Sequence, residues 1–130
     1  APSHPPGPMK KILIVEDDEM VAKALTIRMQ GAGYATDVAT DAIQCVQRAT
    51  AFAPDLILLD VNLPAGSGID VARRLRTLLP PTTPIVFLTA SKQPGLVERA
   101  MSIGSPMSFI EKPYHPKTLL DTASRYLDEP

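Results

Sequence analysis

The chain has 130 residues, with 13 lysines and arginines against 14 aspartates and glutamates, and a formal net charge of −1. This length suits one domain, and a near-neutral charge without a basic cluster argues against direct nucleic-acid binding. The single cysteine, Cys45, excludes an internal disulfide, and no apolar run approaches the roughly 18 residues of a membrane helix, so a cytoplasmic domain without membrane contact is expected.

Prolines mark the first segment. Residues 1–8 carry four of the fourteen prolines, and proline neither fits a helix interior nor donates a hydrogen bond in a sheet. We therefore expect residues 1–8 to be a disordered leader or an expression remnant, with His4 as a tail residue rather than a ligand. One domain is expected over residues 9–130, with Met9 as its natural start.

The first half of this domain alternates strands and helices. An apolar strand is expected at Lys11–Val15, and a helix at about Glu19–Met29. Asp18 suits the N-cap of that helix, because a carboxylate favours a helix N-terminus. A weaker strand at Tyr34–Ala39 fits a sheet edge, and a second helix follows at about Asp41–Ala51.

The second helix carries a modest apolar stripe. Thr40 is expected to cap this helix, and Ile43, Val46 and Cys45 are expected to face the core. Because no histidine lies near Cys45 in the sequence, we interpret this thiol as a packing residue rather than a nucleophile.

The most apolar strand is predicted at Asp55–Leu59, and it ends at a lone carboxylate, Asp60. A continuous run of aliphatic residues is typical of a strand that is buried on both faces. A carboxylate at the point where such a strand leaves the core is costly unless something binds it. Asp60 is therefore the candidate reactive group.

The second half of the chain continues the alternation. Ser67 to Asp70 resembles a capping box at the start of a helix that ends near Leu79. Pro116 is expected at the start of the last helix, because proline suits the first helical turn. The remaining predictions are a strand at Pro84–Leu88, a helix at Pro94–Ile103 with Val97, Ala100 and Met101 facing inward, a strand at Ser108–Glu111 and a final helix that runs to Leu127.

Five strands that alternate with five helices predict right-handed βαβ units. The expected fold is therefore α/β, in three layers, doubly wound around a parallel five-stranded sheet. In such sheets, ligands bind beyond the C-terminal strand ends, at the topological switch point. The side chains predicted at these ends are Glu16, Asp17, Asp60, Thr89 and Lys112.

These strand ends would bring like charges together. Adjacent strands lie about 4.8 Å apart, and two like charges about 4 Å apart repel by about 4 kcal/mol at an effective dielectric near 20. A bound cation would remove this repulsion, and an all-oxygen ligand set favours Mg²⁺. With the metal in place, Asp60 is a suitable nucleophile for phosphorus, and Lys112 and Thr89 can meet the phosphoryl oxygens.

Each of these residues also has a purely structural interpretation. Taken alone, Lys112 could be an ordinary surface lysine, and Thr89 could simply end a strand. Asp60 taken alone could cap a turn. By position, Phe109 suits the core. Only the joint arrangement at separate strand ends favours a single phosphoryl site.

Four segments resemble the receiver (CheY-like) domain of two-component response regulators, over about residues 10–128. The last of them also resembles FixJ/NarL-type and hybrid-kinase receivers, although it is too short to assign a subfamily. The segments are Ile12–Asp18 (ILIVEDD), Asp55–Pro64 (DLILLDVNLP), Ile85–Ala90 (IVFLTA) and Phe109–Tyr114 (FIEKPY).

The resemblance implies a flavodoxin-like topology with strand order 2-1-3-4-5. It implies that Asp60 accepts a phosphoryl group from a sensor histidine kinase or a phosphotransfer protein. The implied cofactor is Mg²⁺, held by Asp17, Asp60 and the main-chain carbonyl of Asn62, with Glu16 acting through water. Such a domain catalyses only its own phosphorylation and dephosphorylation, and is not a turnover enzyme.

The resemblance also implies a switch. Thr89 would turn toward the phosphoryl group and Phe109 would rotate inward behind it. The signal would appear on the face made by the fourth helix, the fifth strand and the fifth helix, which would control an output domain or partner and could form a homodimer. The other residues implied to surround the site are Ala90, which leaves room for the phosphoryl group, Asn62 and Ser91, which tune dephosphorylation, and Pro113, which follows Lys112.

Three positions depart from the family pattern. Glu16 replaces the commoner aspartate of the acidic pair, which leaves metal binding credible. Ser67 stands where aspartate is commoner, and as a helix cap it changes little. The segment Gly104–Ser108 is one residue longer than usual and contains a proline, which puts the geometry of the output face in question.

Three other classes of function fit the sequence less well. A phosphatase of the haloacid dehalogenase type needs a second aspartate two residues after the nucleophile, where this chain has Asn62. A receiver without phosphoryl chemistry is disfavoured by the intact set of site residues. A flavodoxin-like cofactor binder would need glycine, serine or threonine after the first strand, where this chain has acids.

Overall fold

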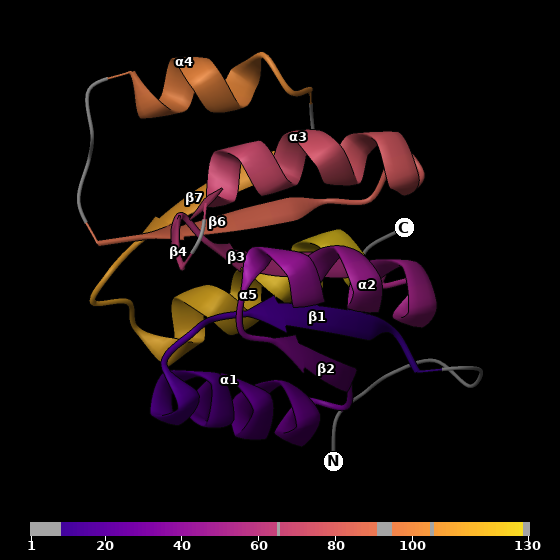
Figure 1. The fold of residues 1–130 in the computed structure, drawn as a ribbon. Helices are drawn as coiled ribbons and strands as arrows, with labels where there is room; N and C mark the ends of the chain where they lie inside the picture. Colours follow the sequence, from indigo (N-terminus) through magenta and orange to yellow (C-terminus); the bar gives the residue numbers. More distant parts are fainter. Residues whose placement is uncertain (1–8, 65, 91–94, 105, 129–130) are drawn as a thin grey trace.

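The computed structural model describes residues 9–64, 66–90, 95–104 and 106–128, and its main sheet is covered by helices on both faces (Figure 1). The predicted leader, residues 1–8, lies outside this range, as do Ser91, Pro94 and Ser105. In chain order the elements are β1 (Lys11–Val15), α1 (Glu19–Gly31), β2 (Ala35–Ala39), α2 (Ala42–Phe52), β3 (Leu56–Asp60), β4 (Asn62–Leu63), β5 (Gly66–Ser67), α3 (Gly68–Leu78), β6 (Ile85–Thr89), α4 (Leu96–Met101), β7 (Met107–Glu111) and α5 (Pro116–Leu127).

The main sheet has five parallel strands in the order β2-β1-β3-β6-β7. Counting only the strands of this sheet, the order is 2-1-3-4-5, so the predicted topology and the edge position of β2 are confirmed. The chain leaves β1 toward β2 on one side and returns to β3 on the other. The C-terminal ends of β1 and β3 therefore form the topological switch point, where ligands bind in doubly wound folds.

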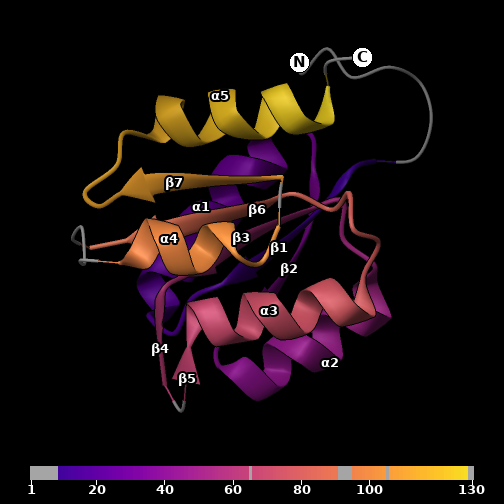
Figure 2. The ribbon, with the colours of Figure 1, turned by 90° about the horizontal axis from the view of Figure 1, so that it is seen from above.

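The three central strands are buried on both faces. Leu13, Ile57 and Phe87 belong to a core that α2, α3 and α4 cover, whereas Ile14 and Leu58 belong to a second core under α1 and α5. Figure 2 shows α5 on one side of the sheet and α2 and α3 on the other. This double burial explains the aliphatic runs in β3 and β6. Among the residues that the structure describes, no helix is long and apolar enough to cross a membrane.

Helix caps agree with the sequence in most places. The Asp18 carboxylate accepts hydrogen bonds from the amides of Met20 and Val21, which confirms it as the N-cap of α1. Ser67 caps α3 through the amide of Ile69. The prediction for α2 is wrong by one residue, because Asp41 rather than Thr40 is the N-cap and accepts from the amide of Gln44.

The predicted inward faces of two helices are wrong in part, although the predicted inward position of Cys45 is confirmed. In α2, Cys45 and Ala49 are buried, whereas Ile43 is 68% exposed. The small side chains of Cys45 and Ala49 let this helix approach the sheet closely. The helix therefore buries these two residues rather than the more apolar Ile43. In α4, the structure buries Leu96 and Ala100 and leaves Val97 and Met101 exposed, so the predicted stripe is rotated. The predicted inward position of Ala100 is confirmed.

The start of β7 is anchored from α3. The Arg76 guanidinium donates to the main-chain oxygen of Pro106 at 2.8 Å and also to that of Thr83. The same Pro106 oxygen accepts from the amide of Ile85. Arg76 therefore fixes the N-terminal ends of β6 and β7, beside the segment that the sequence marks as unusually long.

Candidate phosphoryl-transfer site

Asp60 is the last residue of β3 and is 4% exposed. Its Oδ1 accepts from the amide of Asn62 at 2.9 Å, and its Oδ2 accepts from Nζ of Lys112 at 3.1 Å. The next amide, that of Val61, donates to the main-chain oxygen of Leu88 in β6 at 2.9 Å. Both the carboxylate and the backbone that follows it are thus held in place.

Two acidic residues from the end of β1 join Asp60. Glu16 is 2% exposed, whereas Asp17 is exposed. One carboxylate oxygen from each of the three residues lies within 4.8 Å of the others. The prediction that the two strand ends bring their carboxylates together is confirmed.

Lys112 partly neutralises this cluster. Its Nζ lies 3.3 Å from Oε2 of Glu16 as well as 3.1 Å from Asp60. Its amide donates to the main-chain oxygen of Thr89 at 2.7 Å, which ties the residue to the end of β6. Burial alone would lower the pKa of Lys112, but its hydrogen bond to Asp60 and the negative charge of Glu16 raise that pKa above its ordinary value.

The cluster keeps an excess of negative charge. Burial, followed by repulsion from Asp60, raises the pKa of Glu16 to about 7. One lysine therefore does not compensate the three carboxylates. A divalent cation would favour the ionised form of Glu16, and oxygen donors from partly hydrated carboxylates suit Mg²⁺. The donor set thus fits the expected metal.

The structure also describes the predicted site residues Thr89, Ala90, Phe109 and Pro113, whereas Ser91 lies outside the described residues. Thr89 is buried at the end of β6, and Ala90 follows it in an exposed position. Phe109, in the middle of β7, is partly buried and stacks on Phe87 with ring centroids 5.2 Å apart. Pro113 follows Lys112 in an exposed position.

The response regulator receiver domain family matches residues 12–124 of this chain. The chain belongs to this family. MtrA, a DNA-binding response regulator of Mycolicibacterium paratuberculosis, is 40% identical over 111 residues, which cover 85% of this chain and 48% of MtrA. DltR, a transcriptional regulatory protein of Streptococcus agalactiae, is 34% identical over 110 residues, which cover 85% of this chain and 48% of DltR. The chain therefore spans about half the length of these curated relatives.

Solved receiver structures share the fold. The chemotaxis protein CheY4 of Vibrio cholerae superposes with a TM-score of 0.84 at 30% identity, covering 92% of this chain and 100% of that one. A CheY-like receiver from Methanospirillum hungatei gives a TM-score of 0.87 at 24% identity, covering 93% and 95%. The chain is thus a receiver domain of the two-component type, a signalling switch rather than a classical enzyme. The narrower FixJ/NarL assignment stays a prediction.

Gly68 is a part of this receiver that the sequence prediction missed. A Cβ on Gly68 would lie 2.3 Å from the main-chain oxygen of Asp60 and 2.8 Å from Cα of Val61. The amide of Gly68 also donates to the main-chain oxygen of Val61 at 2.7 Å. The start of α3 therefore packs directly on the backbone that carries Asp60. One sequence feature could have pointed to this contact. Gly68 occupies the first position of a helix, directly after the serine cap, although most other residues favour a helix more than glycine does.

The raised pKa of Glu16 predicts an unusual pH dependence of stability. Without a divalent cation, folded Glu16 keeps its proton up to a pKa of about 7, against an ordinary value of 4.5. Between these values the folded state binds more protons than the unfolded state, so the free energy of unfolding should fall as pH rises, by about 1–3 kcal/mol. Urea unfolding in EDTA across this pH range measures it.

The matched variants for this test are Glu16→Gln and Glu19→Gln. The first should flatten the pH dependence, because an amide does not titrate. The second should leave it unchanged, since Glu19 is exposed. A slope that persists in Glu16→Gln would contradict the assignment of the effect to Glu16.

Proposed function

We propose that Asp60 accepts a phosphoryl group from a phosphohistidine of a sensor histidine kinase or phosphotransfer protein. A carboxylate oxygen of Asp60 forms the new bond to phosphorus. The bond from phosphorus to the donor histidine nitrogen breaks, and the nitrogen leaves with the electron pair. The observation that carries this proposal is the convergence of Glu16, Asp17 and Lys112 on one buried carboxylate.

Charge balance supports these roles. Mg²⁺ held by Asp17, Asp60 and the main-chain carbonyl of Asn62, with Glu16 acting through water, would supply the positive charge that lets an anionic nucleophile meet a phosphoryl group. Lys112 already donates a hydrogen bond to Asp60. Its ammonium group is therefore close enough to stabilise the negative charge on the oxygens of a phosphoryl group bound to Asp60. Binding of Mg²⁺ and transfer of the phosphoryl group at this site would let the domain catalyse its own phosphorylation and dephosphorylation.

The proposed switch runs from Thr89 to Phe109. Thr89 turns its hydroxyl to the phosphoryl group, and Phe109 moves inward from its stack on Phe87. These changes shift the population of two packings of the face formed by α4, β7 and α5. Ala90 leaves room for the phosphoryl group, and Asn62 and Ser91 set the dephosphorylation rate.

The face formed by α4, β7 and α5 then controls an output domain or partner, with homodimerisation as one route. MtrA is a DNA-binding regulator about twice as long as the matched region. In a protein organised in the same way, this domain would control DNA binding without contacting DNA itself. A cytoplasmic location follows from exchange of phosphoryl groups with a kinase.

Intact-mass measurement after incubation with acetyl phosphate tests the proposed reaction. With Mg²⁺, the protein should gain the mass of one phosphoryl group, because acetyl phosphate is a small acyl phosphate donor that needs no kinase. With EDTA, the gain should fall by more than about tenfold, since the carboxylate cluster then repels the donor. An equal gain in EDTA, or no gain with Mg²⁺, would contradict the proposal.

A further inference from the structure

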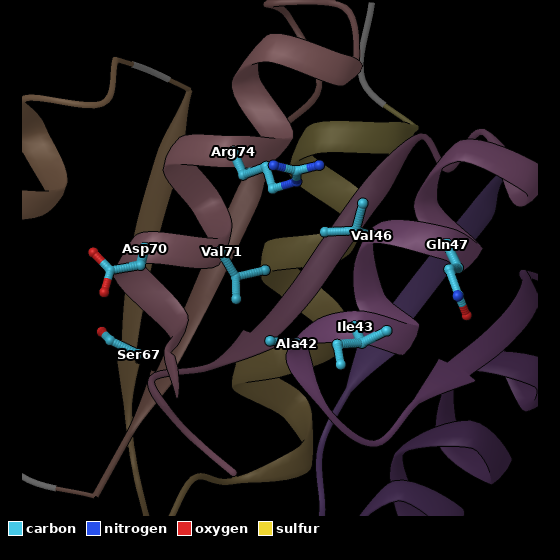
Figure 3. A pocket seen from close by; sticks show the side chains of 8 residues that line it. All are labelled: Ala42, Ile43, Val46, Gln47, Ser67, Asp70, Val71 and Arg74. Carbon is cyan, nitrogen blue, oxygen red and sulfur yellow. The ribbon is translucent and has the colours of Figure 1, made fainter. Parts of the chain in front are cut away.

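A groove of about 480 Å³ lies between α2 and α3, and its lining includes none of the four charged residues of the carboxylate cluster (Figure 3). Ile43 and Val46, one turn apart on α2, form one wall. Val71 and Arg74, one turn apart on α3, form the other. Ser67 lies at the end of the groove nearest the β4–β5 hairpin, where it pairs with Asn62.

The groove exposes apolar surface that the fold does not use. Ile43 is 68% exposed although it belongs to an amphipathic helix. Cys45 and Ala49 fill the space between α2 and the sheet, so Ile43 and Val46 are left to line the groove. Fully burying an isoleucine side chain is worth about 1.5–3 kcal/mol. An occupant of the groove could gain part of that free energy.

The unmatched charge at the groove is positive. Asp70, on its edge, already forms an ion pair with Arg73 at 3.4 Å. Among the described residues, the guanidinium of Arg74 has no ion-pair or hydrogen-bond partner. Charge complementarity therefore favours an occupant with a carboxylate near Arg74 and disfavours a basic one.

The size of the groove separates two kinds of occupant. A stable interface between two copies of a protein uses about 20–30 residues on each side, whereas eight residues line this groove. A single helix needs only a few anchors at i, i+3 or i+4 spacing to bind in a groove. We propose that the α2–α3 groove docks an acidic amphipathic helix of a partner protein. Apolar side chains of the partner helix would contact Ile43, Val46 and Val71, and one of its carboxylates would pair with Arg74.

Two stapled helical peptides of equal length test this proposal with the full chain. Both carry leucines at i and i+4, and they differ in having glutamate or lysine one turn further on. The acidic peptide should shift the amide NMR signals of residues 42–47 and 67–74. It should also bind at least about tenfold more tightly than the basic peptide, a difference of 1.4 kcal/mol.

Charge reversal and a matched surface change make the test specific. Arg74→Glu should invert the preference, so that the basic peptide binds more tightly. Ile43→Asp should abolish binding without unfolding the protein, whereas Ile27→Asp, at a 61% exposed site on α1, should leave binding unchanged. The proposal is overturned if neither peptide shifts these signals, if the shifts map to another surface, or if Arg74→Glu leaves the preference unaltered.

Discussion

Asp60→Asn is expected to lower the rate of phosphoryl uptake from acetyl phosphate by more than about a thousandfold, because an amide does not serve as the nucleophile. The same change should stabilise the metal-free protein by about 1 kcal/mol above neutral pH, since it removes the like charge that, after burial, raises the pKa of Glu16. Intact-mass kinetics and urea unfolding in EDTA measure the two effects.

Asp70→Asn is the matched control. It removes a carboxylate that follows the same loop but is exposed and forms an ion pair with Arg73. It should leave both the uptake rate and the pH dependence of stability unchanged. If Asp60→Asn protein took up phosphoryl groups at the normal rate, another residue would have to be the acceptor.

Gly68→Ala is expected to slow phosphoryl uptake by about tenfold or more and to destabilise the fold by about 1–3 kcal/mol. The added methyl group would lie 2.3 Å from the main-chain oxygen of Asp60, so the strand end or the start of α3 must move. Moving the strand end displaces the Asp60 carboxylate from Lys112. Uptake kinetics and urea unfolding again provide the measurements.

Gly31→Ala controls for the loss of a glycine. A Cβ at Gly31, in the last turn of α1, meets nothing within 4 Å. This variant should be neutral or slightly more stable, because alanine favours a helix more than glycine does. A Gly68→Ala protein with normal uptake and normal stability would show that the contact with Asp60 does not position the carboxylate.

The sheet and the cluster could be predicted because strong physical constraints act on few residues. The aliphatic runs of β3 and β6 favour burial on both faces, and a parallel sheet brings the C-terminal ends of all its strands, including β1 and β7, to one edge. Acidic and basic side chains at those ends must then meet. The structure confirms this for Glu16, Asp17, Asp60 and Lys112, at the distances that a shared site requires.

The helix faces and the close contacts could not be predicted in the same way. In α2 the structure confirms Cys45 as inward, but it buries Ala49 beside it rather than the larger Ile43, which hydrophobicity alone favours. The packing distance between helix and sheet decides that choice, and it is a property of the whole fold. Gly68 is a similar case, because its role depends on a close contact with the backbone of Asp60. Only the path of the folded chain reveals that contact.

The position of the phosphoryl group tests the central claim most directly. Borohydride reduces an acyl phosphate to an alcohol, so a phosphorylated aspartate becomes homoserine, which peptide mass mapping detects. After treatment with acetyl phosphate and Mg²⁺ and then borohydride, homoserine should be found at position 60 and at no other aspartate. Homoserine at another position, or a phosphoryl group that survives borohydride, would contradict the account.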